Sequence, residues 1–98
     1  MRPLLLLALV ATLPGCAQIH SNLNLVDAEV AIEGARAAGA AKSAPYEYTA
    51  AEAYLHKARE ELGYAQYGAA AELARESQEL AERAHQKATD AGKAGDAR

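Results

Sequence analysis

Apolar and small residues recur at spacings of three and four through the middle of the chain, which is the period of an α-helix. The clearest run alternates three and four as a heptad seam does: Tyr48, Ala51, Leu55, Ala58, Leu62 and Ala65. Pro45 stands just before this run, and proline fits the first turn of a helix. The pattern therefore predicts a helix over 45–63.

A second helical pattern comes earlier in the chain. Asn24 is a residue type that caps helix starts, and Asp27 stands three residues later, which resembles a capping box. The apolar and small positions that follow are Leu25, Ala28, Ile32, Ala35 and Gly39. We expect a helix over 24–41, weakened at its end by the glycine.

The third pattern follows two glycines and predicts a helix over 66–91. Its stripe consists of Ala70, Leu73, Ser77, Leu80 and Ala84. Gly63 and Gly68 bracket a joint that is either a turn between antiparallel helices or a weak stretch of one long helix, and we favour the turn. The predicted fold is all-α: three helices, the last two forming a long antiparallel Ala-rich hairpin. The helical domain is placed at 24–91, and the segment 92–98 is expected to be a frayed tail.

Composition makes this body slender. Alanine supplies 26 of the 98 residues, Phe and Trp are absent, and the large apolar residues beyond residue 16 are few. Such a core is thin, so helix propensity must contribute much of the stability, and little room remains for an internal ligand pocket. The net charge is −3 and the basic residues are scattered, which gives no indication of nucleic-acid binding.

The N-terminus combines a signal-peptide pattern with the only cysteine of the chain. Residues 4–13 are apolar except for Thr12, a run too short for the roughly 20 residues that span a bilayer. The sequence Leu13-Pro14-Gly15-Cys16 then resembles a bacterial lipobox. We expect a signal peptide over 1–15, cleavage between Gly15 and Cys16, lipidation (palmitate included) of Cys16, and a tether over 16–23. The alternative is a signal peptide cut elsewhere, with Cys16 unmodified.

The residue after the cysteine bears on location. Ala17 stands where an aspartate would favour retention at the inner membrane of enteric-type bacteria, so the chain resembles an outer-membrane lipoprotein that faces the periplasm. Several acyl chains together anchor a protein stably, whereas one binds only marginally.

Longer segments carry a family resemblance, over about residues 28–85. After the lipobox, "GARAAGAAKSAPYEYTAAEAYLHKAREEL" and "YAQYGAAAELARESQELAERA" resemble an uncharacterised family of small Ala-rich bacterial envelope lipoproteins, whose helical module is a domain of unknown function. The resemblance implies a helical hairpin in the cell envelope. The second half also resembles a single tetratricopeptide repeat in part, through Tyr67, Ala70, Tyr54 and Ala58.

No catalytic or metal-binding pattern accompanies these helices. His20, His56 and His85 share no helical face at i,i+4, and the serines lack the G-x-S-x-G turn of a hydrolase. We expect neither an enzyme nor a cofactor or metal. The five tyrosines cluster in the middle of the sequence and form a candidate interaction surface, with core packing as the alternative: Tyr46, Tyr48, Tyr54, Tyr64 and Tyr67.

These features predict an outer-membrane lipoprotein that presents a helical hairpin to a periplasmic or envelope protein. The alternative is a self-associating coiled-coil lipoprotein resembling the major murein lipoprotein, possible as a homo-oligomer. That alternative needs one uninterrupted helix, whereas Pro45 and the glycines interrupt the pattern here.

Overall fold

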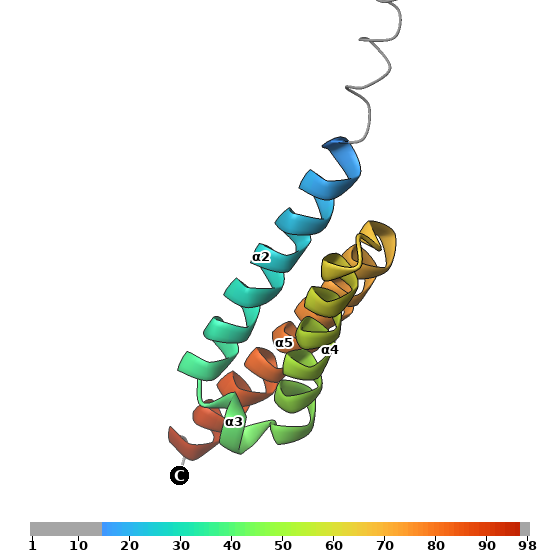
Figure 1. Cartoon of the computed structure of the whole chain (residues 1–98). Coiled ribbons are helices and arrows are strands. Elements are labelled where there is room, and N and C mark those ends of the chain that lie inside the picture. The colour runs from blue at the N-terminus through green and yellow to red at the C-terminus, as the bar shows by residue number, and fades with distance from the viewer. Residues whose placement is uncertain (1–14, 97–98) are drawn as a thin grey trace, which may run out of the picture.

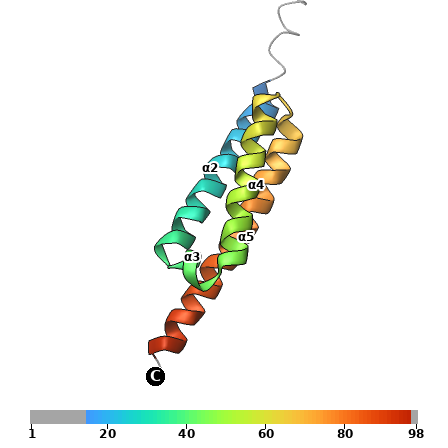
Figure 2. The same ribbon diagram turned by 60° about the horizontal axis from the view of Figure 1, so that its bottom comes forward.

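The computed structural model describes residues 15–96, and within that range it contains four helices and no strand. They are α2 (Gly15–Ala37), α3 (Ala40–Ser43), α4 (Pro45–Gly63) and α5 (Tyr67–Asp96). The long helices α2 and α5 run in the same direction, and α4 runs antiparallel to both (Figures 1 and 2). The predicted all-α fold with a long antiparallel hairpin, α4 against α5, is confirmed.

Helix α5 packs along both α2 and α4, which contact one another less. Each long helix buries a seam with heptad spacing. The buried positions are Ser21, Leu25, Ala28, Ile32 and Ala35 on α2, Tyr48, Ala51, Leu55 and Ala58 on α4, and Ala70, Ala74, Ser77, Leu80, Ala81, Ala84 and Ala88 on α5. Because five of these seven α5 residues are alanine and a sixth is serine, two helices can approach α5 closely at once.

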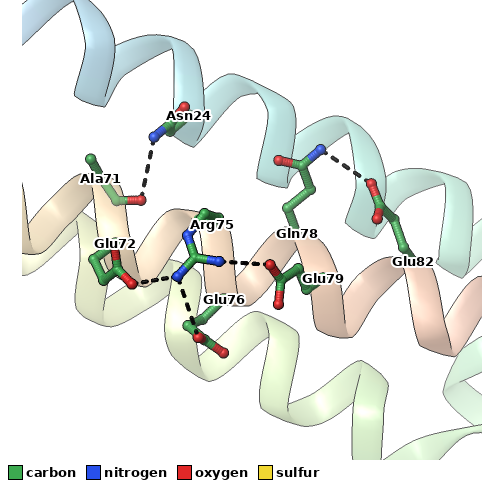
Figure 3. A network of polar contacts seen from close by, with 8 residues as sticks. All are labelled: Asn24, Ala71, Glu72, Arg75, Glu76, Gln78, Glu79 and Glu82. Atoms are coloured by element: carbon green, nitrogen blue, oxygen red, sulfur yellow. Dashed lines mark hydrogen bonds and ion pairs between the residues drawn. The ribbon is translucent and has the colours of Figure 1, made fainter.

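Two hydrogen bonds from side chains to backbone carbonyls link these helices. The buried Ser77 hydroxyl of α5 donates to the Ala51 carbonyl of α4 at 2.6 Å. The Asn24 amide of α2 donates from Nδ2 to the Ala71 carbonyl of α5 at 3.4 Å, as Figure 3 shows. Each of these hydrogen bonds fixes the axial position of one helix relative to its neighbour. Contacts between alanines alone define that position poorly.

The corner between α2 and α4 follows from one glycine and one proline. Gly39 has φ 85°, the left-handed conformation that suits glycine, and its N–H donates to the Arg36 carbonyl at 3.0 Å. After the single turn of α3, Pro45 occupies the first turn of α4. The predicted helix over 45–63 is confirmed at both ends.

The turn between α4 and α5 is also confirmed, so the alternative of one long helix is wrong. Its left-handed residue is Ala65, with φ 58°, rather than either glycine. The N–H of Ala65 donates to the Leu62 carbonyl at 3.0 Å, and the N–H of Gln66 donates to the Glu61 carbonyl at 2.9 Å. These two bonds form a Schellman motif that ends α4. Gly63 and Gly68 lie inside the adjoining helices.

The first helix departs from the prediction over 24–41. It begins nine residues earlier, so the backbone of 16–23 is helical and is not an extended tether. Asn24 is an interior residue of α2, so its predicted role as a cap is wrong. The seam extends back through Ser21, a small polar residue that an apolar pattern does not include.

The last helix is longer than the predicted 66–91. It continues to Asp96, so residues 92–96 are helical where a frayed tail was expected. Gly92 and Gly95 each cost about 1 kcal/mol relative to alanine, and the surrounding alanines are strong helix formers. Residues 97–98 lie outside the described range, as does the predicted signal peptide up to residue 14.

Candidate interaction surface

The five tyrosines do not form one surface, because α4 separates them along its length. Tyr46 begins α4 and is 78% exposed, whereas Tyr64 follows its end and is 77% exposed. Eighteen residues of helix place them about 27 Å apart along the axis, at 1.5 Å per residue. Clustering in the sequence therefore does not become clustering in space.

Tyr48 belongs to the core, so its assignment to an interaction surface is corrected. It occupies a seam position of α4 and is buried. Its hydroxyl accepts a hydrogen bond from Arg36 Nε at 2.8 Å. This hydrogen bond, with the neighbouring Glu33 carboxylate, raises the pKa of Arg36 above its ordinary value. The pair joins the end of α2 to the start of α4.

The remaining two tyrosines are less exposed. Tyr54 borders a shallow hollow between α4 and α5, together with Ala53, Lys57 and Leu73. Tyr67 is half-buried as the first residue of α5. Tyr64 and Tyr67 both lie at the turn between these helices.

A different apolar surface lies on the outer face of α2. Leu23, Val26 and Val30 are 58%, 53% and 67% exposed, although large apolar residues are scarce in this chain. They alternate along the helix with the buried Leu25 and Ile32. Helix α2 thus has two apolar sides, one packed in the bundle and one facing solvent. We call the three exposed residues the α2 stripe.

The α2 stripe was missed in the sequence because it shares its segment with the core seam. Leu23, Val26 and Val30 recur at spacings of three and four, as a seam does. A helical projection that asks for two apolar faces, rather than one, would find them.

A groove of about 280 Å³ runs between α2 and α4, where these two helices diverge. Ile32 and Leu55 line its apolar part, and five charged residues complete the lining: Glu29, Glu33, Arg36, Glu52 and Arg59. Arg59 pairs with Glu29 across it. An open groove with ionic rims suits side chains of another protein better than an enclosed small molecule.

The exposed face of α5 is an ion-pair network. Arg75 pairs with Glu72, with Glu79 at 2.7 Å and with Glu76 at 3.8 Å, as Figure 3 shows. The hydrogen bond from Arg75 to Glu72, aided by the other carboxylates, raises the pKa of this guanidinium. Pairs of this kind along one helix face are typical of a solvated surface.

The two histidines whose side chains the structure describes lie on exposed helix faces. His56 Nε2 lies 3.3 Å from Glu60 on the exposed side of α4, and His85 is exposed on α5. Residues 15–96 contain no group of three or more His, Cys, Asp or Glu side chains that could hold a metal. Gly15 and Cys16 begin α2, and the Cys16 and His20 side chains lie outside what the structure describes. Among the described helices, none has the length and apolar character needed to cross a bilayer.

Three long helices around an alanine seam, with an exposed apolar stripe and an open groove, define a small helical bundle domain. The chain belongs to the family described as "Domain of unknown function (DUF4398)", which matches residues 23–97. The predicted resemblance to an uncharacterised family is confirmed to that extent. Neither a curated protein nor a solved structure matches the chain.

Proposed function

We propose that this chain is a lipid-anchored protein on the periplasmic face of a bacterial outer membrane, where it presents its helical bundle to another envelope protein. The anchor is Cys16, exposed by cleavage after Gly15. The sequence Leu13-Pro14-Gly15-Cys16 and the following Ala17 support attachment and location. No enzymatic activity and no cofactor belong to this proposal.

The α2 stripe is the observation that carries the binding function. Apolar residues left on the surface of a small domain with a thin core forgo stability that burial would provide, about 25 cal/mol for each Å². A contiguous exposed apolar patch is typical of an interaction site. The stripe lies along one helix, so a helix of the partner fits it best.

The charged residues beside the stripe indicate which charge the partner carries. Asp27, Glu29 and Glu33 lie beside the stripe, and Arg36 is the only basic residue between 21 and 37. The described part of α2 therefore carries a net charge of −2, from three carboxylates and one guanidinium. A partner helix with an apolar face and basic edges complements this surface.

Site-specific crosslinking in intact cells tests the binding function. A photoreactive residue replaces Val26 in the stripe, and a matched variant carries it at Glu79 on the ion-pair face of α5. We expect the Val26 variant to form a discrete adduct with one other envelope protein, identified by mass spectrometry, and the Glu79 variant to form none. Equal adducts from both positions, or none from either, would contradict a binding role of the stripe.

Self-association is the second candidate, because a chain with an exposed helical stripe can pair with its own copy. Sedimentation equilibrium of the fragment 17–98 separates the two. A monomer at micromolar concentration agrees with binding to a different protein, whereas a stable dimer or trimer favours self-association through the stripe. The partial likeness to a tetratricopeptide repeat remains a prediction.

A further inference from the structure

The turn between α4 and α5 lies at the same end of the bundle as the start of α2 (Figures 1 and 2). The hydrogen bond between Asn24 and the Ala71 carbonyl places these two residues of the parallel helices α2 and α5 at the same height along the bundle axis. Cys16 is eight residues before Asn24, and Tyr67 is four residues before Ala71. At 1.5 Å per residue, the backbone of Cys16 stands about 6 Å beyond Tyr67 along the bundle axis.

The hairpin residues at this end, 62–71, carry no charge, and the carboxylates of Glu61 and Glu72 flank them. Residues 62–71 form the longest run without Asp, Glu, Lys or Arg after Asp27. Within it Tyr64 is largely exposed and Tyr67 half-exposed, and the rest are small residues, Leu62 and Gln66. We call 62–71 the hairpin tip. An exposed neutral segment with two tyrosines is unusual on a surface that is otherwise laced with ion pairs.

The opposite end of the bundle differs in charge. The corner carries Lys42 and Glu47, and the end of α5 carries Lys87, Asp90 and Lys93. The contrast gives the bundle an uncharged hairpin tip at one end and a charged corner at the other, and helix α2 begins at the end that carries the tip.

We infer that the hairpin tip docks on the lipid surface and holds the bundle end-on to the membrane, an inference that rests on the proposed anchor at Cys16. Acyl chains on Cys16 enter the bilayer within about two helical turns of the tip. Tyrosine is favoured at the level of lipid headgroups, because its ring is apolar and its hydroxyl stays hydrated. Charged side chains, which would resist this contact, are absent from the tip.

The end-on orientation has a consequence for binding. Val26 and Val30 of the α2 stripe, and the groove between α2 and α4, lie further along the bundle and stand clear of the bilayer, whereas Leu23 is level with Ala70 of the tip. A partner in the periplasm can reach both surfaces. A bundle lying flat on the stripe would instead hide Leu23, Val26 and Val30 in lipid.

Tryptophan fluorescence tests this orientation, because the chain contains no tryptophan of its own. Tyr64→Trp reports on the tip, and Tyr46→Trp is the matched control, because the two tyrosines are almost equally exposed at opposite ends of α4. Val26→Trp reports on the stripe. Each full-length variant is purified from membranes and reconstituted into phosphatidylethanolamine–phosphatidylglycerol vesicles that contain a doxyl-labelled lipid.

We expect the indole at position 64 to emit at shorter wavelength and to be quenched several-fold more than the indoles at positions 46 and 26. Equal quenching at 64 and 46, or stronger quenching at 26, would overturn the end-on docking. Flotation of the same samples checks the anchor separately. Protein that floats while position 64 stays unquenched leaves the anchor standing and refutes the docking, whereas protein that fails to float refutes both.

Discussion

Alanine stabilises the fold at some positions of this chain and destabilises it at another. At Ala28, Ala51 and Ala74 it is fully buried and lets neighbouring helices approach closely. At Ala65 it adopts a left-handed backbone, with φ 58°, for which its Cβ is unsuited. That conformation costs about 1–2 kcal/mol for an L-residue other than glycine. The Schellman hydrogen bonds at the end of α4 maintain it.

Replacing Ala65 with glycine therefore raises stability. Removal of the left-handed penalty outweighs the greater freedom of glycine in the unfolded chain, and the net gain is about 0.5–1 kcal/mol. Urea denaturation followed by circular dichroism measures it. Ala53→Gly, at an exposed position inside α4, is the control and is expected to lose about 1 kcal/mol. A loss of stability in Ala65→Gly would refute the left-handed turn.

The role of a residue could be predicted from the sequence where local backbone preference alone decides it. Pro45 starts α4 as its ring requires. Asn24 was misassigned as a cap because its amide instead bonds the Ala71 carbonyl of another helix, a partner that the sequence cannot reveal. The left-handed residue of the turn was also missed, since two nearby glycines are better suited to it than Ala65.

Helix α2 has an apolar seam inside the bundle and an apolar stripe outside it, and two residues that are two positions apart represent the two sides. Ile32 is 4% exposed and Val30 is mostly exposed. Ile32 thus packs in the core, whereas Val30 is free to contact a partner.

Truncation to alanine distinguishes the two sides. Ile32→Ala removes buried methyl groups and is expected to lower the free energy of unfolding by about 2–5 kcal/mol. Val30→Ala removes exposed groups and is expected to change it by less than about 0.5 kcal/mol. Thermal or urea unfolding measures both. A large loss in Val30→Ala would mean that the stripe is part of the core.

An ion pair ties the start of α4 to the later part of α5. Lys87 donates a hydrogen bond to the half-buried Glu47 carboxylate, which lowers the pKa of Glu47 below its ordinary value. A carboxyl group with a lower pKa in the folded state stabilises the fold above its unfolded pKa. That contribution is lost as the pH falls through the folded pKa.

Glu47→Gln should consequently be less stable than the wild type near neutral pH, and the difference should vanish as the pH falls from about 7 to about 3. Urea midpoints at several pH values test this. Glu52→Gln, which removes a carboxylate without an ion-pair partner within residues 15–96, is the control and should show little pH-dependent difference. A Glu47→Gln deficit that grows in acid would contradict the assigned sign.

The helices with the clearest hydrophobic period were predicted best. The helix α4 followed from its heptad spacing, and its antiparallel pairing with α5 followed from the turn placed between Gly63 and Gly68. The early start of α2 did not, because Ser21 is polar yet occupies a seam position. Nor did the late end of α5, because the alanines around Gly92 and Gly95 keep that segment helical. The tyrosines grouped in the sequence were separated in space by the rise of α4.

The whole molecule has a thin core, so its shape depends on small residues along α5. Ala81 and Ala84 are fully buried in the helix that contacts both other long helices. A larger side chain there must push one of them away, and overpacking costs about 1–3 kcal/mol in well-packed cores.

Ala84→Leu is expected to lower the free energy of unfolding by at least that much and to expand the bundle. Ala94→Leu makes the same change at an exposed position near the end of α5 and should be nearly neutral. Thermal unfolding and small-angle scattering measure stability and size. An Ala84→Leu variant as stable as Ala94→Leu would show that α5 is not the close-packed centre of the bundle.

The orientation, the partner surface and the location all depend on attachment at Cys16. Metabolic labelling with a clickable palmitate, followed by membrane fractionation, compares the wild type with Cys16→Ser. A serine hydroxyl cannot form the thioether that carries the lipid, so we expect the wild type to be labelled and recovered with membranes, and Cys16→Ser to lose both properties. A Cys16→Ser variant that keeps its label, or a wild type that is never labelled, would contradict the lipid anchor.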